Sequence, residues 1–248
     1  MNVFIKELTG FSGSKVYLMK NSSNNTLFVR KEGNISRNYE KLTMLASDFD
    51  VPKIYNKTDQ LLDMEYIAGA DMKLFLLRHP VGILSNFIID VIGKFSKTSR
   101  PKDYSNIYIN QLSTIDYTNL PFTMDELYNR LPKILPQSLC HGDFTLENLI
   151  HSKNGQFYMI DAVTGPHDSW MFDIAKMRQD FDGHWFIRNT KIDLSVQLKI
   201  LRDHLYLKFP EAFDDSLYIL MLLRVYCHCK VESDEYRLIT KEIKRLWN

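Results

Sequence analysis

The stretch that decides the fold of this 248-residue chain is His141-Gly142-Asp143-Phe144-Thr145-Leu146-Glu147-Asn148-Leu149-Ile150. After a short turn comes an apolar run that ends in an aspartate, Phe157-Tyr158-Met159-Ile160-Asp161. Phosphoryl transfer needs one carboxylate that orients an acceptor hydroxyl, and an amide oxygen and a second carboxylate that hold Mg²⁺ against phosphates. Asp143, Asn148 and Asp161 supply these three groups in that order.

The same residues also have a simpler interpretation. A glycine followed by an aspartate often marks an ordinary turn. Asn148 could cap a turn, and Asp161 could end a strand. The two segments alone leave both interpretations open, and the rest of the chain has to separate them.

Composition restricts the class of protein. The chain is 45% hydrophobic and 12% aromatic, which predicts a sizeable core rather than disorder. With 31 basic and 30 acidic residues, the net charge of +1 predicts neither a nucleic-acid partner nor an anionic membrane partner. The length suits one large domain or two small lobes, and we expect a monomer or a small homo-oligomer.

The cysteines and the apolar runs predict a cytoplasmic protein. Three cysteines are too few, and odd in number, for a disulfide framework. Cys227-His228-Cys229 could suggest zinc, but no second pair of ligands lies at a useful spacing. The N-terminus has no run typical of a signal peptide, and the apolar run 217–223 is too short to cross a bilayer.

The chain changes character near residue 69. The first part predicts short antiparallel strands and one helix: strands over 3–8, 15–20, 26–31, 54–55 and 61–67, and a helix over 36–47. Later segments are mainly helical: 74–77, 82–96, 124–131 and from 170 to the C-terminus. The sequence therefore predicts an α+β fold of two lobes, a β-rich lobe over 1–68 and a larger helical lobe over 69–248 that carries the acidic loop.

Three further segments of the first lobe could contact a nucleotide. The first is the turn at Gly10, Ser12, Gly13 and Ser14, whose backbone N–H groups could face phosphate, although most such turns are plain hairpins. The second is the strand end Arg30-Lys31, from which we select Arg30 for phosphate and Glu40 as its ionic partner. Both residues could equally be solvated. The third is the extended connection at Glu65, Tyr66 and Ile67, whose backbone could bind adenine or simply link the lobes.

Taken together, these segments resemble the aminoglycoside phosphotransferase and choline kinase superfamily, which is related to the protein kinase fold. The resemblance rests on the catalytic loop His141 to Asn148, the metal-binding Ile160-Asp161, the element Asp173-Ile174-Ala175, the hinge Met64 to Gly69 and the glycine turn Gly10 to Tyr17. Some members have Val-Arg where others have lysine, so Arg30 is an acceptable departure.

The resemblance implies an ATP-dependent, Mg²⁺-requiring enzyme that phosphorylates a hydroxyl of a small molecule. It implies that Asp143 is the base, that Asn148 and Asp161 hold the metal, and that Arg30 contacts phosphate. It also implies that His141 and Asp173 order the catalytic loop.

The acceptor would lie near residues that follow the metal-binding strand. Carboxylates and indoles suit a sugar, an aminoglycoside-like compound or an amino alcohol, and the stretch offers Asp168, Asp180, Asp182 and Trp185. Each of these side chains could instead be structural. A nucleotide-binding pseudokinase that acts as a sensor or scaffold is the alternative function. A protein kinase is disfavoured, because the segment from Asp161 to Asp173 is too short for a peptide-docking platform.

Overall fold

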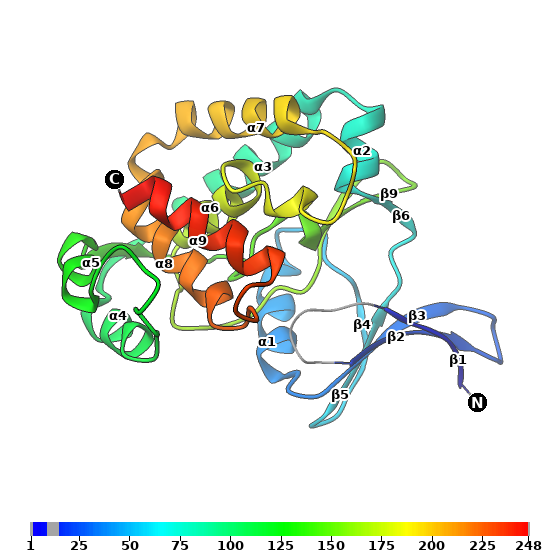
Figure 1. Cartoon of the computed structure of the whole chain (residues 1–248). Coiled ribbons are helices and arrows are strands. Elements are labelled where there is room, and N and C mark those ends of the chain that lie inside the picture. Colours follow the sequence, from blue (N-terminus) through cyan, green and yellow to red (C-terminus); the bar gives the residue numbers. More distant parts are fainter. Residues whose placement is uncertain (1, 9–14, 248) are drawn as a thin grey trace. The chain divides into compact units, whose positions relative to one another are not determined.

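The computed structural model describes residues 2–8 and 15–247, and the chain divides into two compact units (Figure 1). The N-terminal unit comprises Met1–Met72 and Asn148–Gly165, and the C-terminal unit comprises Lys73–Glu147 and Pro166–Asn248. The sequence prediction placed all of residues 69–248 in one lobe, whereas the structure groups 148–165 with the N-terminal strands. The predicted phosphate turn at Gly10, Ser12, Gly13 and Ser14 lies outside the described residues.

The N-terminal unit is built on a five-stranded antiparallel sheet in the order β1-β2-β3-β5-β4 (Figure 1). Its strands are β1 (Asn2–Leu8), β2 (Lys15–Asn21), β3 (Leu27–Glu32), β4 (Ile54–Lys57) and β5 (Leu61–Glu65). Helix α1 (Ser36–Leu45) follows β3, and it buries Leu42 and Leu45. The predicted strands and helix are confirmed here, and their ends differ from the prediction by a few residues.

A second, three-stranded sheet of the same unit joins β6 (Gly69–Asp71), β9 (Leu149–Ser152) and β10 (Phe157–Met159) in the order β10-β9-β6. The sequence analysis treated Gly69 as a break, but this residue pairs with Ser152 at the start of β6. A Cβ atom at Gly69 would lie 2.2 Å from the carbonyl oxygen of His151, so only glycine permits this close backbone approach. The pairing explains why 148–165 belongs to the N-terminal unit.

The C-terminal unit is mainly helical, which confirms the predicted α+β class. Its helices are α2 (Met72–Arg78, whose first residue belongs to the N-terminal unit), α3 (Val81–Ser96), α4 (Ser105–Leu112), α5 (Met124–Arg130), α6 (Trp170–Phe181), α7 (Ser195–Lys208), α8 (Asp215–Tyr226) and α9 (Asp234–Trp247). A two-stranded pair, β7 (Arg100–Asp103) with β8 (Ile134–Gln137), completes it. The sequence analysis did not predict α4, because this short segment carries a weak apolar pattern.

Helix α6 is the central element of the C-terminal unit. All of its residues are buried, and it packs against α3, α7 and α8. Ser169 caps its N-terminus by accepting a hydrogen bond from the N–H of Met171. Among the described residues, none of the helices is both long and apolar enough to cross a membrane. A fully buried helix that carries Asp173, Lys176 and Asp180 is unusual, and these residues lead to the candidate site.

Candidate active site

The metal-binding residues predicted from sequence lie at one end of the β9–β10 hairpin. Asn148 directly precedes β9, and Asp161 follows β10 by one residue, Ile160. The pairing of the two strands continues there, because the N–H of Ile160 donates to the carbonyl of Asn148 at 2.9 Å. The hairpin therefore brings the amide-bearing and the carboxylate-bearing residue to the same end of one small sheet.

The backbone of Asp161 has a conformation that few non-glycine residues adopt. Its φ angle is 57°, in the left-handed region. A residue held there costs about 1–3 kcal/mol, and such residues concentrate at functional sites. About a third of the side chain remains accessible (37%), so its carboxylate can reach a ligand. This observation supports Asp161 as a functional residue on grounds independent of the motif.

Lys31, rather than Arg30, is the cation beside Asp161. The Lys31 ammonium forms an ion pair with Oδ1 of Asp161, and only 6% of the lysine side chain is exposed. Arg30 lies on the opposite face of β3, where its Nε and Nη2 donate to the two carboxylate oxygens of Asp63 at 2.7 and 2.8 Å. Strand alternation predicts that the two cations point to opposite faces, but it does not say which face carries the acidic hairpin. The geometry therefore favours Lys31 over the predicted Arg30 for phosphate contact.

The predicted ionic partner of Arg30 is also placed differently. Glu40 is exposed, and its Oε2 accepts a hydrogen bond from the hydroxyl of Thr164 at 3.3 Å. The residue of α1 that approaches the acidic hairpin is Asn38, which is 4% exposed. Its amide nitrogen donates to Oδ1 of Asp161 at 2.9 Å and to the carbonyl of Ala162 at 3.0 Å. The sequence analysis weighed Lys31 but selected Arg30, and Asn38 did not stand out in the sequence.

The predicted adenine-binding connection lies at the end of β5. The N–H of Glu65 donates to the carbonyl of Lys53 at 2.8 Å, so this donor is already used within the sheet. Tyr66 is partly exposed, whereas Ile67 is buried. Backbone contact between a nucleotide and Tyr66 or Ile67 therefore stays a prediction, whereas the Glu65 donor is engaged within the sheet.

The oxygen donors of this hairpin fit Mg²⁺. Among residues 2–8 and 15–247 there is no group of three or more His, Cys, Asp or Glu side chains arranged for a metal. Mg²⁺ is usually held by one or two carboxylates together with substrate phosphates, rather than by a cage of protein ligands. The Asp161 carboxylate and the Asn148 amide are hard donors of the right kind for such a shared ion.

The loop that carries Asp143 lies in the C-terminal unit and is held by α6. The carboxylate of Asp173 accepts hydrogen bonds from the N–H groups of His141 at 2.5 Å and Gly142 at 2.9 Å. The ring nitrogen Nδ1 of His141 accepts from the N–H of Asp143 at 3.3 Å, and the imidazole stacks on Phe144. These contacts fix the backbone on both sides of Gly142, whose φ of 87° is a conformation that favours glycine.

Asp143 is held ionised by a neighbouring cation. Burial, the largest single effect, raises the pKa of the Asp143 carboxyl, and the ammonium of Lys176, 3.0 Å from Oδ1, is the main cause that lowers it. Arg224 and His141 add smaller effects of the same sign, so the pKa lies below its usual value. About a third of the Asp143 side chain (35%) is exposed. An ionised and accessible carboxylate is the group that an acceptor hydroxyl needs.

Asp180, predicted to line the acceptor pocket, has a different position. It is fully buried, and its Oδ2 accepts a hydrogen bond from the N–H of Leu146 at 2.7 Å. Burial, assisted by the charge of Glu147, raises the pKa of Asp180 to about 7, against the opposing effect of the Leu146 N–H. A carboxylate with no accessible surface cannot bind an acceptor from solvent, so the structure gives Asp180 a role in bracing the catalytic loop.

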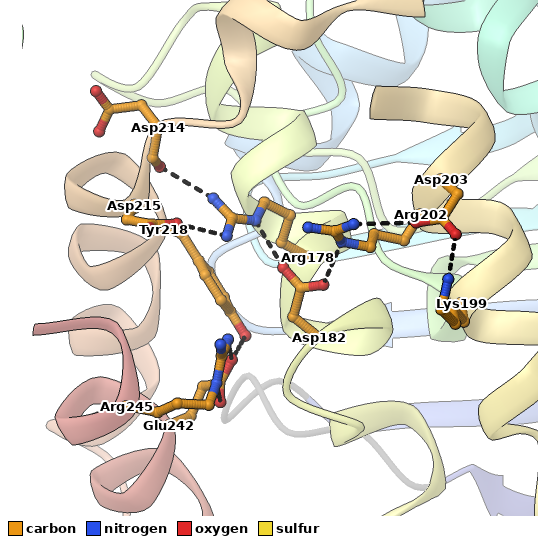
Figure 2. A network of polar contacts seen from close by, with 10 residues as sticks. All are labelled: Arg178, Asp182, Lys199, Arg202, Asp203, Asp214, Asp215, Tyr218, Glu242 and Arg245. Atoms are coloured by element: carbon orange, nitrogen blue, oxygen red, sulfur yellow. Dashed lines mark hydrogen bonds and ion pairs between the residues drawn. The ribbon is translucent and has the colours of Figure 1, made fainter. Parts of the chain in front are cut away.

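Asp182, also predicted for the acceptor, belongs to a network of charged side chains (Figure 2). Its two oxygens accept from Arg178 at 2.8 Å and from Arg202 at 3.1 Å, and 9% of its side chain is exposed. Arg178 continues the network to Asp215 at 2.6 Å. Figure 2 shows Asp182 between the two guanidinium groups, which ties α6 to α7 and α8. This arrangement favours a scaffolding role over acceptor binding.

The remaining predicted acceptor residues are also engaged within the C-terminal unit. Asp168 accepts hydrogen bonds from Lys102 at 2.7 Å and from the hydroxyl of Tyr104 at 2.9 Å. Trp185 is 6% exposed, and the guanidinium of Arg188 lies 4.1 Å from its ring centre. Asp168 keeps partial exposure, so it remains the predicted acceptor residue that solvent reaches best.

Solved structures that match this chain over most of its length include three small-molecule kinases. A thermostable mutant of aminoglycoside phosphotransferase APH(4)-Ia matches with a TM-score of 0.66 at 11% identity, over 97% of this chain and 92% of that one. Choline kinase LicA from Streptococcus pneumoniae matches with 0.61 at 16% identity, over 99% and 94%. Plasmodium vivax ethanolamine kinase matches with 0.53 at 13% identity, over 100% and 82%.

These matches define the fold. The chain has the architecture of the aminoglycoside phosphotransferases and choline kinases, as the sequence motifs predicted. No protein-family model matches the sequence. No curated protein matches it either. The substrate and the activity therefore have to be argued from the residues themselves.

Proposed function

We propose that this protein is an ATP-dependent, Mg²⁺-requiring phosphotransferase that phosphorylates a hydroxyl of a small molecule. The observation that carries the proposal is Asp143, an ionised and partly exposed carboxylate on a loop whose backbone is held by Asp173. Binding of the nucleotide is supported by Asp161 in its left-handed conformation and by Lys31 beside it, both in the N-terminal unit. The fold of the solved small-molecule kinases supports the same reaction class.

Each residue has a defined task in this reaction. Asp143 orients the acceptor hydroxyl and takes its proton as the oxygen attacks the terminal phosphorus of the nucleotide. Asn148 and Asp161 would hold Mg²⁺, which neutralises charge on the phosphates when it is bound. Lys31 contributes a further positive charge toward the phosphates, and the backbone near Tyr66 and Ile67 receives the adenine. The bond to the bridging oxygen breaks, and ADP leaves.

Small hydroxylated molecules are the proposed acceptors. Another solved mutant of the aminoglycoside phosphotransferase is a ternary complex with ADP and hygromycin B, and further matched structures include a choline kinase and an ethanolamine kinase. A sugar, an aminoglycoside or an amino alcohol is therefore the acceptor class to test first. Use of ATP, together with the sparse cysteines, continues to predict a cytoplasmic location.

Acceptor-dependent release of ADP tests the proposal. The purified chain is incubated with Mg·ATP and a panel of sugars, aminoglycosides, amino alcohols and nucleosides, and ADP is measured by a coupled assay. The Asp143→Asn variant serves as the matched control for contaminating kinases. We expect ADP release with one chemical class of acceptor in the natural chain and its loss in the variant. Tight binding of nucleotide without turnover over the whole panel would instead favour the pseudokinase function.

A further inference from the structure

Helix α6 directs one row of charged side chains at the catalytic loop. Asp173, Lys176 and Asp180 are three and then four residues apart, a spacing that places them on a single face of a helix. The two carboxylates accept hydrogen bonds from backbone N–H groups near the two ends of the loop, as described above. The residue between them, Lys176, reaches the side chain of Asp143.

The position of Lys176 is costly for a lysine. It is 6% exposed in the middle of a helix whose residues are all buried. Its ammonium lies 3.0 Å from Oδ1 of Asp143 and 3.2 Å from Oε1 of Gln179. Burying an ammonium costs several kcal/mol unless it is paired, and an apolar residue of similar size is often as stable or more so. Packing alone therefore does not account for a lysine at this place.

We propose that Lys176 is a positioning residue for phosphoryl transfer, whose ammonium keeps the Asp143 carboxylate ionised and fixes its orientation. Asp173 and Asp180 hold the loop backbone, and Lys176 holds the side chain of Asp143. The effect on turnover rests on the proposed function, whereas the effect on the charge of Asp143 does not.

The charges that face Asp143 come from three elements. Lys176 lies on α6, Arg224 on α8, and His141 on the catalytic loop itself. After burial, which acts in the opposite direction, Lys176 has the largest effect on the pKa of Asp143. Removing this one charge should therefore raise the pKa of Asp143, while Arg224 and His141 still act on it.

The first experiment measures the ionisation of Asp143 and needs no activity. The protein is labelled with ¹³C in the aspartate carboxyl groups, and the signal of Asp143 is identified by its loss in Asp143→Asn. Titration by NMR is then compared between the natural chain, Lys176→Met and Lys176→Arg. We expect a higher pKa of Asp143 in Lys176→Met and a low pKa in Lys176→Arg, which retains the charge.

The second experiment uses turnover with an accepted substrate. A displaced catalytic group costs on the order of 10²-fold in rate, so we expect kcat to fall by about this factor in Lys176→Met. Nucleotide affinity should remain unchanged, and the acidic limb of the pH profile of kcat/KM should move to higher pH. Lys176→Arg should recover part of kcat. Lys199→Met, which removes an exposed lysine of the same unit, is the charge-matched control and should show none of these effects.

The outcomes separate the two proposals. An unchanged pKa of Asp143 in a folded Lys176→Met variant would overturn the role of Lys176, whatever the activity. If Lys176→Met does not fold, a raised pKa of Asp143 in Lys176→Arg overturns it equally, because the charge is then not what sets the ionisation. A raised pKa in Lys176→Met without turnover in the natural chain supports the role of Lys176 and contradicts the proposed function.

Discussion

The amide of Asn38 donates a 2.9 Å hydrogen bond to Oδ1 of Asp161, the same oxygen that is ion-paired with Lys31. A neutral donor from α1 therefore meets the acidic hairpin, whereas the residue of α1 that the sequence analysis selected was Glu40, as the ionic partner of Arg30. Because the Asn38 amide carries no charge, it does not compete with the Asp161 carboxylate for the Lys31 ammonium. The contact therefore restrains the side chain of a residue whose backbone is in the left-handed region.

Replacing Asp143 by asparagine tests the proposed base. The change keeps the shape of the side chain but removes the charge that orients the acceptor hydroxyl. We expect kcat to fall by roughly 10²–10⁴-fold, the usual range for a positioned base, while nucleotide binding is retained. Steady-state kinetics and calorimetry with ATP measure the two effects. Turnover close to that of the natural chain in Asp143→Asn would remove Asp143 from the mechanism.

Metal binding should depend on the nucleotide. Asn148 and Asp161 offer hard oxygen donors but no complete cage, so Mg²⁺ alone should bind weakly. We expect Asp161→Ala to abolish the binding of Mg·ATP in isothermal titration calorimetry. Asp90→Ala, which changes an exposed aspartate of α3, is the control. If ATP binds tightly without Mg²⁺, and with the same affinity in Asp161→Ala, the hairpin does not hold the metal.

The two cations of β3 should respond differently to substitution. Lys31→Met removes the charge beside Asp161, and charge-assisted hydrogen bonds to phosphate contribute about 1.5–3 kcal/mol, so the kcat/KM for ATP should fall by roughly 10–100-fold. Arg30→Met instead leaves the buried carboxylate of Asp63 unpaired. We expect it to lower the free energy of unfolding by about 1–3 kcal/mol with nearly unchanged ATP kinetics. Denaturant unfolding and kinetics on both variants separate the roles, and the reverse pattern would restore Arg30 as the phosphate contact.

The buried Asp180 should make stability depend on pH. Its pKa in the folded chain is raised to about 7 from 3.8, so the folded state holds this proton more tightly than the unfolded state does. The protonated Asp180 therefore makes its full contribution to the free energy of unfolding below about pH 4. This contribution is lost as the pH rises to about 7. Asp180→Asn mimics the protonated form, and its stability relative to the natural chain should rise over this range by at most about 1.4 kcal/mol per pH unit.

Denaturant unfolding between pH 4 and pH 8 measures this dependence. The change to asparagine keeps an oxygen that can accept from the N–H of Leu146, so the hydrogen bond to the catalytic loop is retained. Asp90→Asn, at an exposed position, should show no such trend. A stability difference between Asp180→Asn and the natural chain that stays constant with pH contradicts a raised pKa.

Much of the candidate site was predictable because its motifs are local. The strands β1 to β5, helix α1 and the catalytic loop follow from apolar patterns and from the spacing of His141, Asp143 and Asn148, which depend only on near neighbours in the chain. The residues that the sequence analysis missed, Asn38 and Lys176, act across long separations in sequence, and so does Lys31, which the sequence analysis weighed but did not select. No short pattern marks a lysine on one helix as the partner of an aspartate on a distant loop.

The sequence by itself determined the fold class, the order of most of the strands and helices, and the two carboxylates and one amide at Asp143, Asp161 and Asn148. Tertiary structure alone decided which of two adjacent cations, Arg30 or Lys31, faces Asp161, that Asp180 is buried, and that Asp182 is paired with two arginines of the helical unit. The physical reason is that alternation along a strand or helix defines relative faces, whereas the packing of distant segments defines which face is buried. Burial then sets the partners and the pKa of each charged group.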